Sequence, residues 1–348
     1  MSSTNPSGTA RSASAGSGWA WRGGAVRDLR HAWRSLRRHP GHTAVAVATM
    51  ALGIGATTVL FSVASGVLLE PLPYPESERL VVLSETRQGG TNRIAGILTN
   101  GTYLAWQEDP ATLEGLAAWS PARRTVGGAG DPERLRLSRV TPSLFPLLRS
   151  AAALGRVFEP EEDREQLVVL SHGLWRDRYG ADRGVIGEQI RLDDEAYRVI
   201  GVMPAGFAFP DRETQAWLPF HVAPVEVREG GGGSLSMFAA LGRLRPEVTP
   251  QQAAAEGTAR GRGAPEPGMV LMAVFGSRGP VEVTAVRWLD AMTAEVRPAI
   301  LILLAAVGLL LVTATANVAS LQLAAASVRR REVAVRAALG ARGGQLAR

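Results

Sequence analysis

Two long runs without an ionisable side chain interrupt the polar pattern of the sequence. The first covers residues 43–69 and the second residues 298–328, which makes them 27 and 31 residues long. A helix needs about 20 apolar residues to cross the hydrocarbon of a bilayer. A cleaved signal peptide has an apolar stretch of only about 7–15 residues, which argues against that alternative for the first run. The pattern therefore predicts two transmembrane helices, over 43–69 and 297–328.

The residues before the first run divide into two parts. Residues 1–25 are rich in Ser, Gly and Ala, a composition that buries too little apolar surface to become ordered, so we expect a disordered tail. In residues 26–42, apolar side chains recur at helical spacing while arginines take the other positions; the apolar ones are Val26, Leu29, Trp33 and Leu36. This pattern predicts a basic amphipathic cytoplasmic helix on the inner leaflet. The alternative is a solvated basic helix.

Between the two runs, short strand-like segments alternate with turn signals and brief helices. Leu167–Leu170 is apolar throughout and ends at Ser171, a residue suited to cap a helix. Further predicted strands are Leu80–Thr86, Arg134–Val140, Gln189–Leu192, Tyr197–Val202 and Met237–Leu244. Thr249 and Gln252 form a capping box before an Ala-rich helix. We predict an α+β domain of two lobes over 70–296, with Glu229–Ser234 and Gly257–Gly268 as linkers.

The distribution of charge predicts the orientation of the chain. Residues 1–42 hold seven arginines and one acid, residues 329–348 hold six and one, whereas the segment between the spans is acidic overall. Basic residues that flank a span stay on the cytoplasmic side. The membrane-orienting residues are predicted to be Arg34, Arg37, Arg38, Arg329, Arg330 and Arg331. We therefore expect a multi-pass protein of the bacterial plasma (inner) membrane, with both termini cytoplasmic and residues 70–297 extracytoplasmic.

The sequence contains no lysine and no cysteine. All 38 basic residues are arginines. A phosphate-binding loop of the Walker type needs a lysine, so these residues do not form such an ATPase by themselves. The acidic run Glu159–Glu165 lacks the spacing of a calcium loop, and the five histidines show no zinc spacing. We expect no enzyme activity, no metal or cofactor, and no nucleic-acid partner, because the positive charge lies beside the spans.

Several strings resemble the permeases of MacB/FtsX-type ABC transporters, and most closely the acidobacterial duplicated orphan permease branch. They are RRHPG (37–41), ALGIG (51–55), PLPYP (71–75), VVLSHGLWRDRYG (168–180), IGVMPAGFAFP (200–210), GRLRPEVTPQQAAAE (242–256) and RRREVAVRAALGA (329–341). The resemblance implies a MacB-like periplasmic core domain over 70–296. It also implies that 329–348 are a cytoplasmic coupling segment that begins an FtsX-like permease domain. Such domains continue with further spans, so we expect a chain truncated after its second span.

The resemblance further implies a function and partners. A separate ABC ATPase subunit would bind ATP and drive this permease subunit, in export or in mechanotransmission. The ATPase-coupling residues are then predicted to be Glu332, Arg336, Leu339 and Gly340. Membrane lipid and a second copy or second permease half are the other expected partners.

Two alternatives remain open from the residues alone. A two-span membrane sensor or substrate-binding protein would have the same layout of span, external domain and span, but residues 329–348 are short for a signalling output. A membrane-tethered hydrolase would need a catalytic constellation that the sequence does not display.

Overall fold

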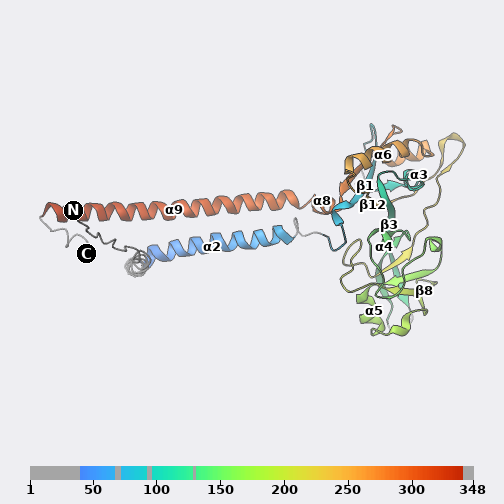
Figure 1. Cartoon of the computed structure of the whole chain (residues 1–348), viewed down its shortest axis with the longest axis horizontal. Helices are drawn as coiled ribbons and strands as arrows, with labels where there is room; N and C mark the ends of the chain where they lie inside the picture. Colours follow the sequence, from blue (N-terminus) through green and yellow to red (C-terminus); the bar gives the residue numbers. More distant parts are fainter. Residues whose placement is uncertain (1–39, 67–71, 92–95, 128–130, 340–348) are drawn as a thin grey trace, which may run out of the picture. The chain divides into compact units, whose positions relative to one another are not determined.

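The computed structural model describes residues 40–66, 72–91, 96–127 and 131–339 (Figure 1). They form two compact units. One consists of the helices α2 (Pro40–Ala64) and α9 (Arg297–Ala338), and the other lies within Leu68–Glu295.

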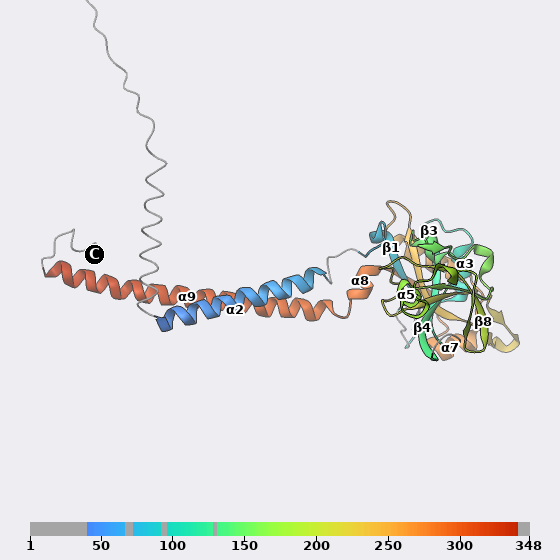
Figure 2. The ribbon, with the colours of Figure 1, turned by 90° about the horizontal axis from the view of Figure 1, so that it is seen from below.

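Helices α2 and α9 pack against each other (Figure 2). A side-chain carbon added to Gly53 would lie 3.2 Å from Leu311 Cδ1, so the missing side chain allows the close approach. Ala64 and Ala314 are buried, while large apolar side chains such as Phe61 and Leu309 remain exposed. Val47–Ala64 and Arg297–Ser320 are long and apolar enough to cross a membrane. This agrees with the two predicted spans.

Helix α9 is longer than a membrane span requires. Its 42 residues give a length of about 63 Å at 1.5 Å per residue, roughly twice the thickness of the hydrocarbon. The helix continues without a break from the apolar window past residue 328 and into the predicted coupling segment. The second span and the first part of that segment are therefore one rod.

One sheet of 11 strands organises the second unit, in the order β13-β1-β12-β3-β4-β9-β6-β8-β5. β2 pairs with β12, and β7 pairs with both β3 and β8. The strands of this sheet are β1 (Leu80–Arg87), β2 (Leu98–Thr99), β3 (Leu113–Gly127), β4 (Glu133–Val140), β5 (Leu154–Gly155), β6 (Leu167–Leu170), β7 (Gln189–Leu192), β8 (Glu195–Val202), β9 (Ala216–Pro219), β12 (Met237–Leu244) and β13 (Val281–Arg287). A separate hairpin pairs β10 (Glu226–Val227) with β11 (Gly233–Ser234).

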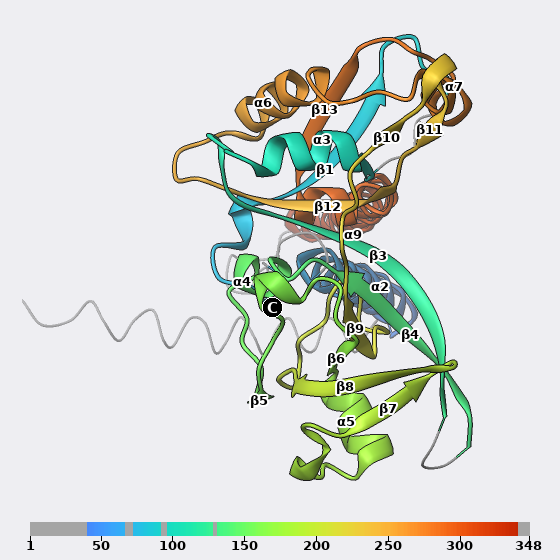
Figure 3. The same cartoon turned by 90° about the vertical axis from the view of Figure 1, so that its right-hand side faces the viewer.

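The helices divide this unit into two lobes joined by β3 and β4 (Figure 3). The first lobe carries α3 (Asn100–Gln107), α6 (Pro250–Arg262) and α7 (Gly268–Phe275), and the second carries α5 (His172–Tyr179); the one-turn helix α4 (Leu144–Leu147) lies between them. Helix α8 (Trp288–Thr293) contacts β1 and β13. Four short 3-10 helices complete the fold: η2 (Ser77–Arg79), η3 (Pro160–Glu162), η4 (Arg183–Val185) and η5 (Glu229–Gly231). The α+β fold predicted from the sequence is confirmed.

Local signals in the sequence account for several of these boundaries. Ser171 caps α5 by accepting a hydrogen bond from the Leu174 backbone N–H. Thr249 and Gln252 form the predicted capping box at the start of α6. Asp193 adopts a left-handed φ of 54° between β7 and β8, which allows the tight hairpin there. The helix cap at Ser171 and the capping box at Thr249 and Gln252 confirm the predictions made from the sequence.

The prediction of two glycine-rich linkers is wrong for Glu229–Ser234 and for the first half of Gly257–Gly268, whereas residues 263–267 do connect α6 with α7. Helix α6 extends through Arg262, because Gly257 and Gly261 face α3: a side-chain carbon at Gly257 would collide with the Trp106 ring, and one at Gly261 would lie 2.9 Å from Thr102 Oγ1. The glycines allow two helices to pack closely rather than breaking a helix. Glu229–Ser234 contains η5 and β11, so it forms the end of a hairpin.

Candidate functional site

Two aromatic rings join the segments that lead into and out of the sheet unit. Tyr74 lies in the segment that follows the first apolar run, and Trp288 is the first residue of α8, which precedes α9. The two rings stack with centroids 5.4 Å apart and planes 16° from parallel. Trp288 is 5% exposed and Tyr74 7%, so the stack belongs to the core. Burial raises the pKa of Tyr74, and its hydroxyl donates a 2.7 Å hydrogen bond to the Ala208 carbonyl.

Further aromatic rings pack edge-on around this pair. Phe209 contacts Trp288 at 5.5 Å and 67°, and Phe207 contacts Tyr74 at 6.1 Å and 78°. Both phenylalanines come from the loop between β8 and β9. Edge-to-face pairs of this kind each add about 0.5–1.5 kcal/mol beyond the buried area. The stack is therefore anchored in the central core that the two lobes share.

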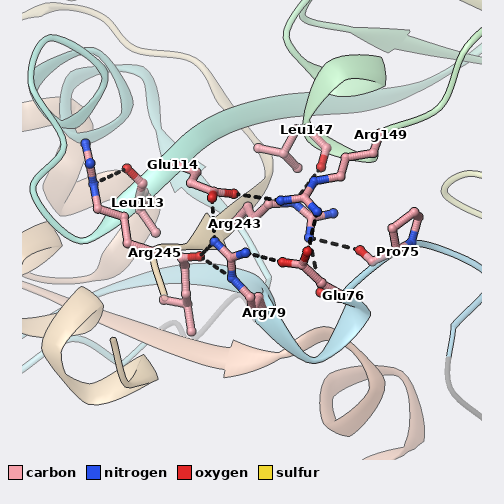
Figure 4. A network of polar contacts seen from close by, with 10 residues as sticks. Pro75, Glu76, Arg79, Leu113, Glu114, Leu147, Arg149, Arg243 and Arg245 are labelled. Carbon is pink, nitrogen blue, oxygen red and sulfur yellow. Dashed lines mark hydrogen bonds and ion pairs between the residues drawn. The ribbon is translucent and has the colours of Figure 1, made fainter. Parts of the chain in front are cut away.

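A buried arginine also binds the segment after the first apolar run, which we call the incoming segment (Figure 4). Arg243, on β12, is 2% exposed. Its Nε donates to the Leu147 carbonyl at 2.8 Å, and its Nη1 donates to the carbonyls of Pro75 and Glu76 at 3.0 and 3.1 Å. Burial, followed by the charges of Arg149 and Arg79, lowers the pKa of Arg243. A single guanidinium thus joins the incoming segment, β12 and the end of α4.

Four charged residues beside Arg243 form a closed ring of ion pairs, which Figure 4 shows as dashed lines. Arg79 and Arg149 each contact both Glu76 and Glu114; the Arg79 Nη2–Glu114 Oε1 distance is 2.7 Å. Hydrogen bonds from Arg149 and Arg79 lower the pKa of Glu76, and the hydrogen bond from Arg79 is the main cause that lowers the pKa of Glu114. The Arg79 side chain also donates to the Leu244 carbonyl through Nε at 2.8 Å.

We call this assembly the joint; it consists of Tyr74, Glu76, Arg79, Glu114, Arg149, Arg243 and Trp288. The contacts tie the segment after the first apolar run to the segment before α9 and to strands β3 and β12. Its chemistry is structural, because arginines paired to carboxylates and carbonyls hold backbone in place. Within the part of the chain that the structure describes, no group of three His, Asp or Glu could hold a metal ion.

The predicted coupling residues lie at the far end of α9. Glu332 and Arg336 fall on this helix four residues apart, a spacing that places them on one face. Leu339 directly follows the helix and is 81% exposed. Gly340 and the orienting residues Arg34, Arg37 and Arg38 lie outside the described residues. Of the orienting residues on α9, Arg330 and Arg331 are exposed, and only the backbone of Arg329 is described.

The joint was not predicted from the sequence. Tyr74 and Arg243 both fall inside strings that carry the family resemblance, PLPYP and GRLRPEV, but neither has a chemical signature of its own. The available signal was an arginine at position 243 in an otherwise apolar predicted strand. Such a residue is buried only where its donors find acceptors, and the sequence does not show which carbonyls these are.

A mixed sheet unit inserted between two long apolar helices defines a class of membrane protein with one large domain between two spans. The MacB-like periplasmic core domain family matches residues 43–260, and the chain belongs to this family. It is thus related to the permeases of MacB/FtsX-type ABC transporters, as the sequence motifs predicted. Together with the two apolar helices, this assigns the chain to the inner membrane.

Two curated relatives are both described as the macrolide export ATP-binding/permease protein MacB. The protein from Rhodospirillum rubrum is 24% identical over 334 residues, which are 90% of this chain and 47% of the relative. The protein from Nitrosomonas europaea is 23% identical over 192 residues, 52% of this chain and 28% of the relative. The chain therefore spans at most about half the length of these relatives.

Solved structures of similar proteins include the periplasmic region of MacB from Actinobacillus actinomycetemcomitans, with a TM-score of 0.44 and 12% identity over 64% of this chain and 94% of that one. The extracellular domain of the noncanonic ABC-type transporter YknZ from Gram-positive bacteria gives a TM-score of 0.41 and 12% identity, over 59% of this chain and 99% of that one.

Proposed function

We propose that this chain is a permease subunit that couples a separate cytoplasmic ABC ATPase to an extracytoplasmic domain, in export or in mechanotransmission. The observation that carries the proposal is the continuity of α9. One helix runs from the apolar window through Arg330 and Arg331 to Ala338, so a force applied to its last turns reaches the other end without passing through a loop. The membership of the family and the ATP-binding/permease relatives support the ATPase as the source of that force.

In this mechanism the joint passes the motion of α9 on to the sheet unit. Trp288 lies nine positions before Arg297, the first residue of α9, and its ring is stacked on Tyr74 from the segment after the first apolar run. A displacement of the segment that carries Tyr74 or of the segment that carries Trp288 therefore acts on the same buried core. Packed cores shift between discrete arrangements rather than deforming continuously. Chemistry in the external domain is not needed for such a role. In this proposal ATP is bound by the partner.

The orientation follows from the arginines. With Arg34, Arg37 and Arg38 before the first span and Arg329, Arg330 and Arg331 after the second, both termini are cytoplasmic and residues 70–297 are extracytoplasmic. Exposed apolar side chains on α2 and α9 face membrane lipid or a second permease copy or half. A two-span sensor has the same layout, but the continuous α9 rod favours mechanical coupling over a flexible signalling tail.

The contact with the ATPase is assigned to Glu332, Arg336, Leu339 and Gly340, at the end of α9. The test is co-purification of an ABC ATPase with the full chain from native membranes. We expect Glu332→Ala combined with Arg336→Ala to abolish most of the recovered ATPase. The matched control, Arg329→Ala with Arg330→Ala, removes two charges from the same helix and should leave recovery largely intact.

Two results would contradict the proposal. Full recovery of the ATPase with the first double variant would remove the coupling role from these residues. An equal loss with both double variants would assign the effect to membrane anchoring, because each arginine at the inner leaflet contributes about 1 kcal/mol of surface attraction.

A further inference from the structure

A small cleft opens in the sheet unit between α3 and the segments around α4 and η3. Its volume is about 270 Å³. The walls are largely aromatic and aliphatic, formed by Tyr103, Leu104, Phe158, Phe220 and Val222. Ligand sites that enclose a drug-sized molecule measure about 300–1,000 Å³, so this cleft suits one apolar ring with its attached chain rather than a large ligand.

The wall contains polar groups that are already engaged. Thr141 Oγ1 and Ser143 Oγ lie 3.0 Å apart, and Ser143 Oγ donates to the Leu116 carbonyl at 2.8 Å. Burial raises the pKa of Tyr103 to about 12, so its hydroxyl stays protonated. Arg139 covers the Phe220 ring at 4.8 Å from the centroid. The aromatic walls are thus held in place before any ligand arrives.

The carboxylate of Asp163, at the cleft, has one oxygen that can bind a ligand. Asp163 Oδ2 lies 2.5 Å from His221 Nδ1, and His221 Nε2 lies 2.6 Å from Arg164 Nη2. A guanidinium only donates, so Nε2 accepts and the proton of the neutral ring sits on Nδ1, where it is donated to Asp163. The side chain of Asp163 is 32% exposed, and no described residue forms a hydrogen bond to its Oδ1.

The charges around this carboxylate are predominantly negative. Asp163 belongs to the acidic run Glu159–Glu165, in which Arg164 is the single basic residue. Arg156 forms an ion pair with Glu162 at 2.6 Å and lies 3.7 Å from Glu159, while Glu161 and Glu165 remain exposed. Counted with Arg139, Arg156, Arg164 and Arg198, whose charge acts on Glu162, the five acids leave a net charge of −1, and Asp163 is the acid of this run that lines the cleft. Such a combination attracts an apolar group that carries a positive charge.

We propose that this cleft binds a cationic amphiphile, whose apolar ring lies against Phe158, Phe220 and Val222 and whose ammonium group pairs with Asp163. The site extends the proposed export function, on which its physiological purpose rests, by naming a ligand class and the residues that select it. His221 positions the carboxylate by holding Oδ2, which leaves Oδ1 available to the ligand.

The test measures binding of 4-phenylbutylammonium to the full chain in nanodiscs of zwitterionic lipid, with a ring-fluorinated probe followed by fluorine NMR. Empty nanodiscs give the contribution from partition into lipid. We expect saturable binding that Asp163→Asn weakens about fivefold, the scale of one partly exposed ion pair. The neutral analogue 4-phenylbutanol should bind Asp163→Asn and the unaltered chain equally. Phe220→Leu should weaken binding of both probes.

The matched control is Glu165→Gln, which removes a charge from the same acidic run without altering the cleft wall. It should reduce ammonium binding far less than Asp163→Asn does. Absence of saturable binding would overturn the proposal. So would equal affinity for 4-phenylbutanoate, or an equal effect of Asp163→Asn on the charged and neutral probes. Circular dichroism of each variant identifies any that fails to fold, and none of these readouts requires the ATPase.

Discussion

Tyr74 and Trp288 are 214 positions apart in the sequence, yet their rings stack 5.4 Å apart in a buried core. One precedes the external domain's first strand and the other follows its last, so the stack closes the domain at the place where the chain enters and leaves it. The proposed mechanical coupling requires a connection of this kind, because the two helices can move the domain only through the segments that they share with it.

Removal of the Trp288 ring should loosen the joint. Truncation of a buried aromatic to alanine costs about 3–5 kcal/mol, so Trp288→Ala should lower the thermal unfolding midpoint of the detergent-solubilised chain by several degrees. Trp288→Phe retains a stacking partner for Tyr74 and should lower the midpoint much less. Equal midpoints for Trp288→Ala and the unaltered chain would show that the stack contributes little to stability.

Replacement of Arg243 should also destabilise the domain. Arg243→Met removes this donor from the buried carbonyl of Leu147 and from the part-buried carbonyls of Pro75 and Glu76, and a buried group left unsatisfied costs about 1–3 kcal/mol. Limited proteolysis should then cut the segment near Pro75 faster. Arg245→Met is the matched control, since Arg245 is exposed and its loss should change the cleavage rate little. Similar rates for the two variants would contradict the role of Arg243 as an anchor.

The ring of ion pairs predicts a dependence of stability on pH. The pKa values of Glu76 and Glu114 lie below their ordinary value of 4.5 because arginines bind the charged carboxylates. Lowered carboxyl pKa values stabilise the fold above the ordinary value, and this stabilisation is lost as the pH falls through the folded-state values. Glu76→Gln combined with Glu114→Gln should therefore be less stable than the unaltered chain at pH 7, and the difference should shrink as the pH falls below 4.5. Thermal unfolding across this range measures the difference, with the exposed Glu161→Gln as the control.

The helix contact at Gly257 should not tolerate a side chain. A carbon at this position collides with the Trp106 ring, so Gly257→Ala should cost about 1–3 kcal/mol despite the higher helix propensity of alanine. Gly263→Ala, at the exposed end of α6, provides the comparison, because the nearest atom there is 3.5 Å away. A midpoint for Gly257→Ala at or above that of the unaltered chain would disprove the steric explanation.

The orientation can be tested with single cysteines, because the sequence has none of its own. Ser150→Cys should react with a membrane-impermeant maleimide in intact spheroplasts, whereas Ala338→Cys should react only after the membrane is opened. Labelling of Ala338→Cys in intact spheroplasts would disprove a cytoplasmic C-terminal segment.

The sequence by itself determined the features that depend on local patterns. The two apolar runs predicted the helices α2 and α9, and Ser171 and Thr249 marked where α5 and α6 begin, since a cap bonds to backbone only a few residues away. The family motifs predicted the external domain. The sequence does not distinguish the helix contact at Gly257 from a linker, because a glycine in a linker and a glycine under a crossing helix look alike in one dimension.

Only the tertiary structure decided what lies at the joint. Arg243 is one arginine among 38, and its importance comes from three carbonyls of residues 75, 76 and 147, far from it in the sequence. The acidic run Glu159–Glu165 likewise showed only that it lacks the spacing of a calcium loop, and the fold then placed Asp163 beside His221 and an aromatic cleft. The burial of a side chain and its hydrogen-bond partners depend on the packed chain. Strand order sets which distant segments meet, and no local pattern encodes that order.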